Sequence, residues 1–248
     1  MSIKNIWKED FRVLSFHMDP NSKAHLTSIC NFLQEGAGAH AESAGFGFDD
    51  MMRRNQVWVL SRLKVKIASY PKWKDQLKLK TWSLGKEGIF YVRDFEIEDC
   101  DNQSIIKATS SWAAINTKTR RPERVVGLEE GLHSLKDKRA IDENLTKLPE
   151  MQHPVFLRKR KIEYTDIDLV YHVNNVKHIE IIINSFPKEM LLNQNIECLE
   201  INYLSEAKYG EDVLIYSDQL ENNVTLVKVV RESDDNEVCR AQLNWVAN

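Results

Sequence analysis

The sequence predicts an α+β protein made of two copies of one unit, each a long amphipathic helix lying on a strongly curved antiparallel sheet. Three observations support this class. Apolar residues alternate in several segments, they follow helical spacing in two others, and both patterns occur twice in the same order. At 248 residues the chain can form two such units. Packing a helix on a sheet is the simplest way to bury both apolar faces.

The two helices are predicted from stretches in which an aspartate stands six residues before a histidine. In SFHMDPNSKAHLTSICNFL, Asp19 precedes His25, and apolar residues then follow at helical spacing. In YTDIDLVYHVNNVKHIEIII, Asp166 precedes His172, and the same spacing follows. The repeat therefore aligns Asp19 with Asp166 and His25 with His172.

The strands come from a second matching pair of segments. LKVKIASYPKWKDQLKL from Leu63 aligns without a gap with LEINYLSEAKYGEDVLI from Leu199, and apolar residues alternate in both. Each half continues through two further strand candidates joined by short turns. Both halves end on a strand with a tryptophan in a matching place, Trp112 or Trp245.

These repeats give the expected domains. An N-terminal unit is expected at 1–120, a charged linker with room for a short helix at 121–154, and a C-terminal unit at 155–248.

Composition excludes several classes of protein. The chain has 42% hydrophobic and 29% charged residues, as soluble globular proteins do, and its net charge of -3 creates no field that would attract nucleic acid. No apolar run approaches the roughly 18 residues that span a bilayer, so we expect no membrane partner. The N-terminal segment has neither signal nor transit character, which predicts a cytoplasmic protein.

The four cysteines are scattered without a C-x-x-C pair. They are interpreted as reduced and mostly buried thiols, with no disulfide, metal site or cofactor expected.

The aligned repeat is asymmetric at acidic positions. Asn21 falls opposite Asp168, and Tyr70 falls opposite Glu206. Because these acids occur only in the second unit, we expect that unit to be catalytic and the first unit to hold substrate.

The start of the second helix offers a site for this chemistry. Asn174 or Asn175 is a plausible N-cap, and the first N–H groups of a helix can bind a developing oxyanion. Asp168 could polarise a water, and His172 could orient that acid or share its proton. Glu206 could reach the same place if helix and sheet pack together.

Structural interpretations stand beside these. A D-x-D before a helix is commonly a turn or cap, which we expect of Asp166, and His25 is expected to be structural. For Asp168, His172 and Glu206, the residues alone leave structural and catalytic roles open.

Two further motifs have ordinary explanations. Gly36 begins a G-x-G-x-x-A pattern that resembles a dinucleotide fingerprint, but it follows a helical segment where the fingerprint requires a strand. We expect the small residues there to let helix and sheet approach closely. The basic clusters RRPER and RKRK (158–161) are expected to be solvated, or to dock an acidic protein.

TDIDLVYHVNNVKHIEIIINSFP resembles the signature of the acyl-acyl carrier protein thioesterases of plant plastids and bacteria. The strands NQVWVLSRLKVKI and LEINYLSEA and the two-unit layout extend the resemblance over nearly the whole chain. It implies a tandem (double) hot-dog fold and hydrolysis of a fatty acyl thioester carried on the phosphopantetheine of acyl carrier protein.

The resemblance places the family's catalytic aspartate on Asp168, its histidine on His172 and its later acid on Glu206. Two positions differ from the pattern of the plant enzymes. Val170 stands where the plant enzymes have an asparagine, and Ala207 where they have a cysteine. A cysteine nucleophile at that place is therefore excluded, which favours attack by water.

Other functions on this fold remain open from the sequence: an acyl-CoA thioesterase, a hydroxyacyl dehydratase or a non-catalytic acyl-thioester-binding protein. The acyl chain length and the formation of a homodimer are also open.

Overall fold

The structure is a computed structural model that describes residues 5–221 and 223–248. The first four residues of the N-terminal segment lie outside the described residues. The chain divides into two compact units, Met1–Leu145 and Thr146–Asn248.

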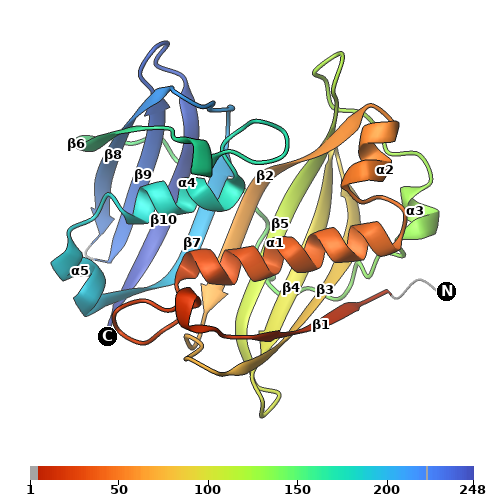
Figure 1. Ribbon diagram of the computed structural model, residues 1–248, viewed down its shortest axis with the longest axis horizontal. Helices are drawn as coiled ribbons and strands as arrows, with labels where there is room; N and C mark the ends of the chain where they lie inside the picture. The colour runs from red at the N-terminus through yellow and green to blue at the C-terminus, as the bar shows by residue number, and fades with distance from the viewer. Residues whose placement is uncertain (1–4, 222) are drawn as a thin grey trace. The chain divides into compact units, whose positions relative to one another are not determined.

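The first unit is a five-stranded antiparallel sheet with a long helix on one face (Figure 1). Its strands pair in the order β1-β3-β4-β5-β2, and α1 contacts β1 and β3. Its elements are β1 (Trp7–Arg12), the 3₁₀ helix η1 (Ser15–His17), α1 (Leu26–Ser43), α2 (Phe48–Arg53), β2 (Gln56–Ile67), β3 (Gln76–Glu87), β4 (Phe90–Glu98), β5 (Ser104–Asn116) and α3 (Leu128–Gly131).

The second unit repeats this plan. Its strands pair in the order β6-β8-β9-β10-β7, so every strand has the counterpart that the repeat predicts. Its elements are β6 (Val155–Lys161), η2 (Tyr164–Asp166), α4 (Asn175–Ile183), α5 (Lys188–Asn193), β7 (Gln194–Tyr203), β8 (Asp212–Glu221), β9 (Val224–Arg231) and β10 (Glu237–Ala247). The predicted α+β class and the repeated layout are confirmed.

The two main helices differ in length, which the sequence pattern did not predict. Helix α1 has 18 residues and α4 has nine. Pro187 follows α4 closely and cannot donate a helical hydrogen bond, so the chain turns there before α5 begins.

Gly36 explains how α1 packs closely on its sheet. A Cβ atom at this position would overlap the Cδ2 atom of Leu79 on β3. The prediction that the small residues permit close approach is confirmed at Gly36.

Different parts of the segment predicted as a linker, 121–154, pack on the two units. In the first unit, Trp82 donates its indole N–H to the carbonyl of Lys138 at 2.6 Å. In the second unit, Arg240 donates to the carbonyl of Pro149 at 2.6 Å. The segment therefore contributes to both units, and it contains the short helix α3.

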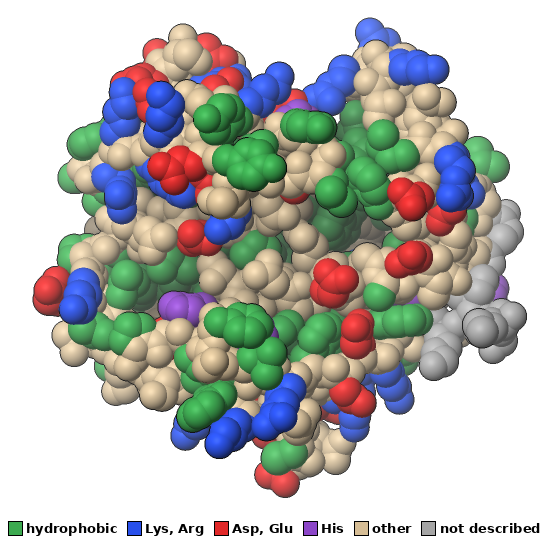
Figure 2. Space-filling model, viewed as in Figure 1, with side chains coloured by type: hydrophobic (Ala, Val, Ile, Leu, Met, Phe, Trp, Pro, Cys, Tyr) green, Lys and Arg blue, Asp and Glu red, His purple; other side chains and the backbone are tan. Residues whose placement is uncertain are grey.

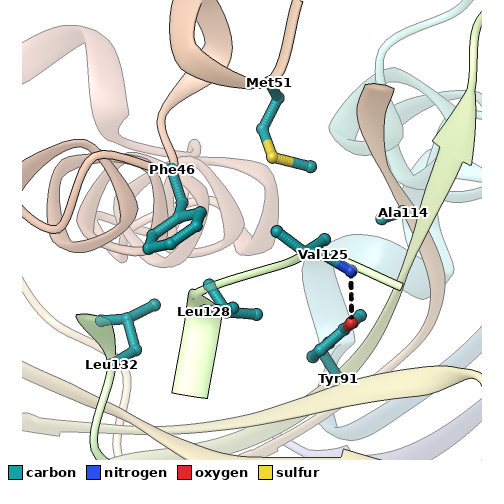
Figure 3. Close-up of a cluster of buried hydrophobic side chains, with 7 residues drawn as sticks. All are labelled: Phe46, Met51, Tyr91, Ala114, Val125, Leu128 and Leu132. Carbon is teal, nitrogen blue, oxygen red and sulfur yellow. Dashed lines mark hydrogen bonds between the residues drawn. The ribbon is translucent and has the colours of Figure 1, made fainter. Parts of the chain in front are cut away.

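A buried apolar cluster holds the chain that follows β5 (Figure 3). The N–H of Val125 donates to the phenolic oxygen of Tyr91 at 2.9 Å within this cluster. Gly131 lies so close to Phe46 that a Cβ atom there would come within 2.5 Å of the ring. The cluster consists of Phe46, Met51, Tyr91, Ala114, Val125, Leu128 and Leu132.

Candidate active site

A tight turn positions the residues that precede α4. An antiparallel bridge between Ile167 and Val173 closes it. The Asp168 N–H donates to the His172 carbonyl at 2.9 Å, and the Tyr171 N–H donates to the Asp168 carbonyl at 3.0 Å. Tyr171 has a φ of 62°, which is uncommon for a bulky side chain. These contacts fix His172 two residues before the N-cap of α4.

His172 and Glu206 form a pair in the second unit. The His172 Nε2 atom lies 3.1 Å from the Glu206 Oε2 atom, and the two side chains are 24% and 37% exposed. Glu206 follows β7, and its carbonyl accepts a hydrogen bond from Arg231 at 2.6 Å. The predicted meeting of these two side chains is confirmed, and the pair is open to solvent.

Asp168 is held by the turn itself. One of its carboxylate oxygens accepts the N–H of Val170 at 3.0 Å. Its backbone N–H connects it to the His172 carbonyl. An aspartate that accepts the N–H two residues later is a common turn former.

Asn174 precedes the first residue of α4, Asn175. The Asn174 side chain accepts the N–H of Val176 at 2.9 Å, so Asn174 is the N-cap. The Asn175 carbonyl accepts a hydrogen bond from the Tyr203 hydroxyl at 3.0 Å. Within the described ranges the Asn175 N–H has no protein acceptor, so it is available to a substrate oxygen.

Asp166 has a structural role, as predicted. Its carboxylate is 1% exposed and accepts two hydrogen bonds from Arg160, at 2.8 and 3.0 Å. It also accepts the N–H of Glu163, and its carbonyl accepts the N–H of Asn174. Asp166 therefore links β6 to the N-cap of α4. The sequence placed Arg160 in a basic cluster but gave no sign that it pairs with Asp166.

His178 lies buried on α4, and nothing in the sequence marked it beyond its place in an apolar helix. Burial lowers the pKa of His178 to about 4, and the negative charge of Asp166 opposes this shift. The imidazole ring lies edge-on to Tyr203, with centroids 5.9 Å apart.

The first unit contains the same turn, and its contacts correct the predicted alignment. The Asp19 N–H donates to the Lys23 carbonyl at 2.8 Å, and the Ser22 N–H donates to the Asp19 carbonyl at 3.1 Å. The Asp19 carboxylate accepts the Asn21 N–H at 2.9 Å. Ser22 has a φ of 60°, as Tyr171 has 62°.

These contacts make Asp19 the counterpart of Asp168 and Lys23 the counterpart of His172. The predicted alignment of Asp19 with Asp166 was therefore wrong by two residues, as was that of His25 with His172. The six-residue spacing of aspartate and histidine occurs in both units by coincidence, whereas the hydrogen bonds of the turn define the true register.

The strand alignment of the repeat holds. The Ala24 N–H donates to the Pro71 carbonyl in the first unit, and the Val173 N–H donates to the Ala207 carbonyl in the second. The residue before each acceptor is Tyr70 or Glu206. The two units therefore differ at His172 and Glu206, while the turn aspartate is common to both.

The described residues contain no group of three His, Cys, Asp or Glu side chains placed to hold a metal ion. No helix in this part of the chain is both long and apolar enough to cross a bilayer.

Comparison with known proteins places this geometry in a family. Residues 4–130 match the family described as "Acyl-ACP thioesterase N-terminal domain", and residues 152–247 match "Acyl-ACP thioesterase C-terminal domain". The chain belongs to the acyl-ACP thioesterase family. Its two units have the hot-dog fold of that family.

Several members of the acyl-ACP thioesterase family are similar to this chain. The chain is 29% identical to the oleoyl-acyl carrier protein thioesterase of Coriandrum sativum, over 90% of this chain and 66% of that protein. It is 31% identical to the palmitoyl-acyl carrier protein thioesterase of Cuphea hookeriana, over 81% of this chain and 52% of that protein. The chain thus spans between half and two thirds of the length of these curated relatives.

Two solved structures of the family are similar over almost their whole length. The acyl-ACP thioesterase of Bacteroides thetaiotaomicron is 29% identical, with a TM-score of 0.83 and 98% of each chain covered. The 12:0-ACP thioesterase of Umbellularia californica is 22% identical, with a TM-score of 0.84 and coverage of 99% of this chain and 98% of that one. The second likeness concerns the fold alone.

The structure shows what occupies the two positions at which this family member departs from the plant pattern. Ala207 is fully buried, and its carbonyl accepts the N–H of Val173. The N–H of Val170 donates to the Asp168 carboxylate. At both positions the backbone forms a hydrogen bond of the turn, and neither side chain carries a reactive group.

Proposed function

We propose that this chain hydrolyses fatty acyl thioesters of acyl carrier protein to a free fatty acid and the carrier thiol. The observation that carries this proposal is the pair formed by His172 and Glu206, 3.1 Å apart in a chain of the acyl-ACP thioesterase family. The names of the curated relatives support a fatty acyl chain on acyl carrier protein as the substrate.

Glu206 is the proposed general base. Its carboxylate takes a proton from water while the water oxygen attacks the thioester carbonyl carbon. His172 donates a hydrogen bond to this carboxylate and so orients it. The thiolate leaves as the carbon–sulfur bond breaks, and the proton on Glu206 passes to the sulfur.

The N-terminus of α4 is the proposed oxyanion site. The N–H of Asn175 would donate to the carbonyl oxygen as negative charge develops, and the helix dipole adds to this stabilisation. Asn174 keeps the helix end in place through its cap. Asp168 orients His172 through the turn.

A thiol-release assay tests the proposal. Saturated acyl thioesters of acyl carrier protein and of CoA are compared across chain lengths, with free thiol as the readout. Turnover on saturated carrier thioesters is expected, and its absence would refute the proposal.

Rival functions give other outcomes in the same assay. Faster turnover on CoA thioesters would indicate an acyl-CoA thioesterase. Conversion of β-hydroxyacyl thioesters without thiol release would indicate a dehydratase. Binding without any turnover would indicate an acyl-thioester-binding protein.

We also propose that the protein works in a reducing compartment such as the cytoplasm. All four cysteines are free thiols; Cys30 and Cys239 are buried, whereas Cys100 is exposed and departs from the expected burial. Size-exclusion chromatography with light scattering will decide between a monomer and the homodimer that the sequence left open.

A further inference from the structure

The turn that follows β5 presents a rigid basic surface. The Asn116 carboxamide accepts the N–H groups of Lys118 and Thr119, at 2.8 and 2.9 Å. The Asn116 backbone N–H donates to the carbonyl of Arg121, and Ile115 forms a bridge with Pro122. These bonds hold the turn through its backbone and the Asn116 side chain, without Lys118 or Arg121.

The charge of this turn is strongly positive. Residues 116–124 contain four Lys or Arg residues and one acid, Glu123. The Glu123 carboxylate accepts hydrogen bonds from Asn116 of the turn and from Gln56, the first residue of β2. Within the described residues, neither Lys118 nor Arg121 has a carboxylate within 4.0 Å. Their positive charges therefore face solvent without compensation.

The turn is fixed to the first unit by the buried cluster of Figure 3. Val125, immediately after the turn, is 3% exposed and bonded to Tyr91. Its neighbour Val126 is 81% exposed. Figure 2 shows Lys and Arg side chains gathered at the top of the view, where Figure 1 draws this turn.

Two residues of the other basic cluster, RKRK on β6, are paired with acids of their own unit, whereas Arg158 and Lys161 have no carboxylate within 4.0 Å in the described part of the chain. Lys159 lies 3.3 Å from Asp212 and 2.5 Å from Glu232. Arg160 is paired with Asp166. An acidic partner would therefore gain little from Lys159 and Arg160.

The loops that carry His172 and Glu206 have no excess of positive charge. Residues 161–174 and 204–212 contain six Asp or Glu residues and two Lys residues. Three of these acids are paired with Lys or Arg side chains of β6 and β9. These loops therefore give an acidic protein no net electrostatic attraction.

We propose that the turn at 116–124 is the docking surface for the acyl carrier protein, an acidic protein. This inference rests on the proposed function, because that function supplies the identity of the partner. The uncompensated charges of Lys118 and Arg121 attract acidic side chains on the carrier, and Val126, two residues after the turn, offers an exposed apolar side chain.

The test is the double variant Lys118→Glu/Arg121→Glu. We expect it to raise KM for a long-chain acyl-carrier thioester by about tenfold or more, since each contact becomes a like-charge repulsion. The kcat/KM for an acyl N-acetylcysteamine thioester, which has no carrier, should stay within about twofold. Unchanged thermal unfolding will show that the fold is retained.

The matched control is Lys72→Glu/Lys74→Glu, which changes two exposed lysines of the same unit by the same charge. We expect the control to change KM by less than about twofold. An equal rise of KM in the control would show that the effect comes from the net charge of the protein and not from the turn, and it would overturn the proposal. The proposal is also overturned if only Arg158→Glu/Lys159→Glu raises KM, or if the variant at the turn has no effect.

A binding experiment separates this inference from the proposed function. Calorimetry measures binding of the unacylated holo-carrier to the parent chain and to the Lys118→Glu/Arg121→Glu variant. If the parent binds the holo-carrier and the variant does not, docking at the turn is supported even if the chain does not hydrolyse the thioester. If the parent does not bind, or if a DNA duplex competes equally well, docking at this turn is refuted, whatever the thiol-release assay shows.

Discussion

Glu206 lies 3.1 Å from His172, and its side chain is 37% exposed to solvent. Replacing Glu206 by glutamine keeps the size of the side chain and removes the base. We expect Glu206→Gln to lower kcat by about 10² to 10⁴, the range typical of a positioned base, with the fold retained. Steady-state kinetics with free-thiol detection provides the measurement. Hydrolysis at the parental rate would remove Glu206 from the mechanism.

Asp168 has a structural reason to be present, because Asp19 forms the same turn in the unit that lacks the pair. Asparagine retains the oxygen that accepts the Val170 N–H. We expect Asp168→Asn to keep its thermal midpoint and to lose about tenfold or less in kcat, well below the loss for Glu206→Gln.

A covalent anhydride on Asp168 is the rival route. Single turnover in ¹⁸O water, followed by analysis of the peptide that contains Asp168, distinguishes the two routes. Label in Asp168, or an equal kinetic loss in Asp168→Asn, would favour the anhydride.

His178 should make the second unit sensitive to acid. Its pKa is lowered from 6.5 to about 4 by burial, so the unfolded chain binds the proton more tightly than the folded one. The stability that neutral His178 provides is complete above pH 6.5 and falls as the pH decreases towards 4. The loss is on the order of 3 kcal/mol over this window.

The variant His178→Phe keeps a ring beside Tyr203 and removes the titrating group. We expect its unfolding free energy to depend less on pH between 6.5 and 4 than that of the parent. Urea unfolding at several pH values measures this, with the exposed His153→Gln as control. Parallel curves for parent and His178→Phe would contradict the assignment.

At the scale of elements, the N-terminus of α4 contains both the N-cap, Asn174, and the proposed oxyanion donor, the N–H of Asn175. We expect Asn174→Ala to lower the unfolding free energy by about 1 kcal/mol through loss of the cap. Asn174→Ser should retain most of that energy, because a serine hydroxyl also accepts the Val176 N–H. Chemical denaturation gives the values. Asn175→Ala is the matched control, and an equal cost there would show that the cap is not the cause.

Strand β6 explains why RKRK stands where it does. β6 comes last in the strand order of its unit, so one of its sides carries no ladder to another strand of that unit. Lys and Arg on such an edge discourage pairing with another chain. The sheet edge and the nearby acids thus explain Lys159 and Arg160 without a docking partner.

At the scale of the whole molecule, charge is unevenly distributed although the net charge is only -3. Salt screens the attraction of the basic turn after β5 beyond about one Debye length, roughly 8 Å at physiological salt. We expect KM for the acyl-carrier thioester to rise as ionic strength increases, while KM for the acyl N-acetylcysteamine thioester stays constant. Kinetics over a salt series measures both.

Lys118→Glu/Arg121→Glu should abolish that dependence on salt. If the variant and the parent respond to salt equally, the attraction comes from charges other than those of the turn.

Local sequence patterns were sufficient to predict the α+β class, the repeated unit, the succession of its elements along the chain and the candidate residues Asp168, His172 and Glu206. These features are local or repeated: alternation of apolar residues defines a strand within a few residues, and two copies reinforce one another. The resemblance to a family assigned Asp168, His172 and Glu206 to catalysis and added the expectation of a thioester substrate.

The register of the two turns became clear only in the folded chain, because hydrogen bonds such as that from the Asp19 N–H to Lys23 leave no spacing signature. The compensation of one basic cluster also depends on folding, since Asp212 and Glu232 lie far from Lys159 in the sequence and reach it through strand pairing. The contact between His172 and Glu206 likewise depends on packing across residues distant in the chain. Local patterns define elements, whereas contacts between distant residues define sites.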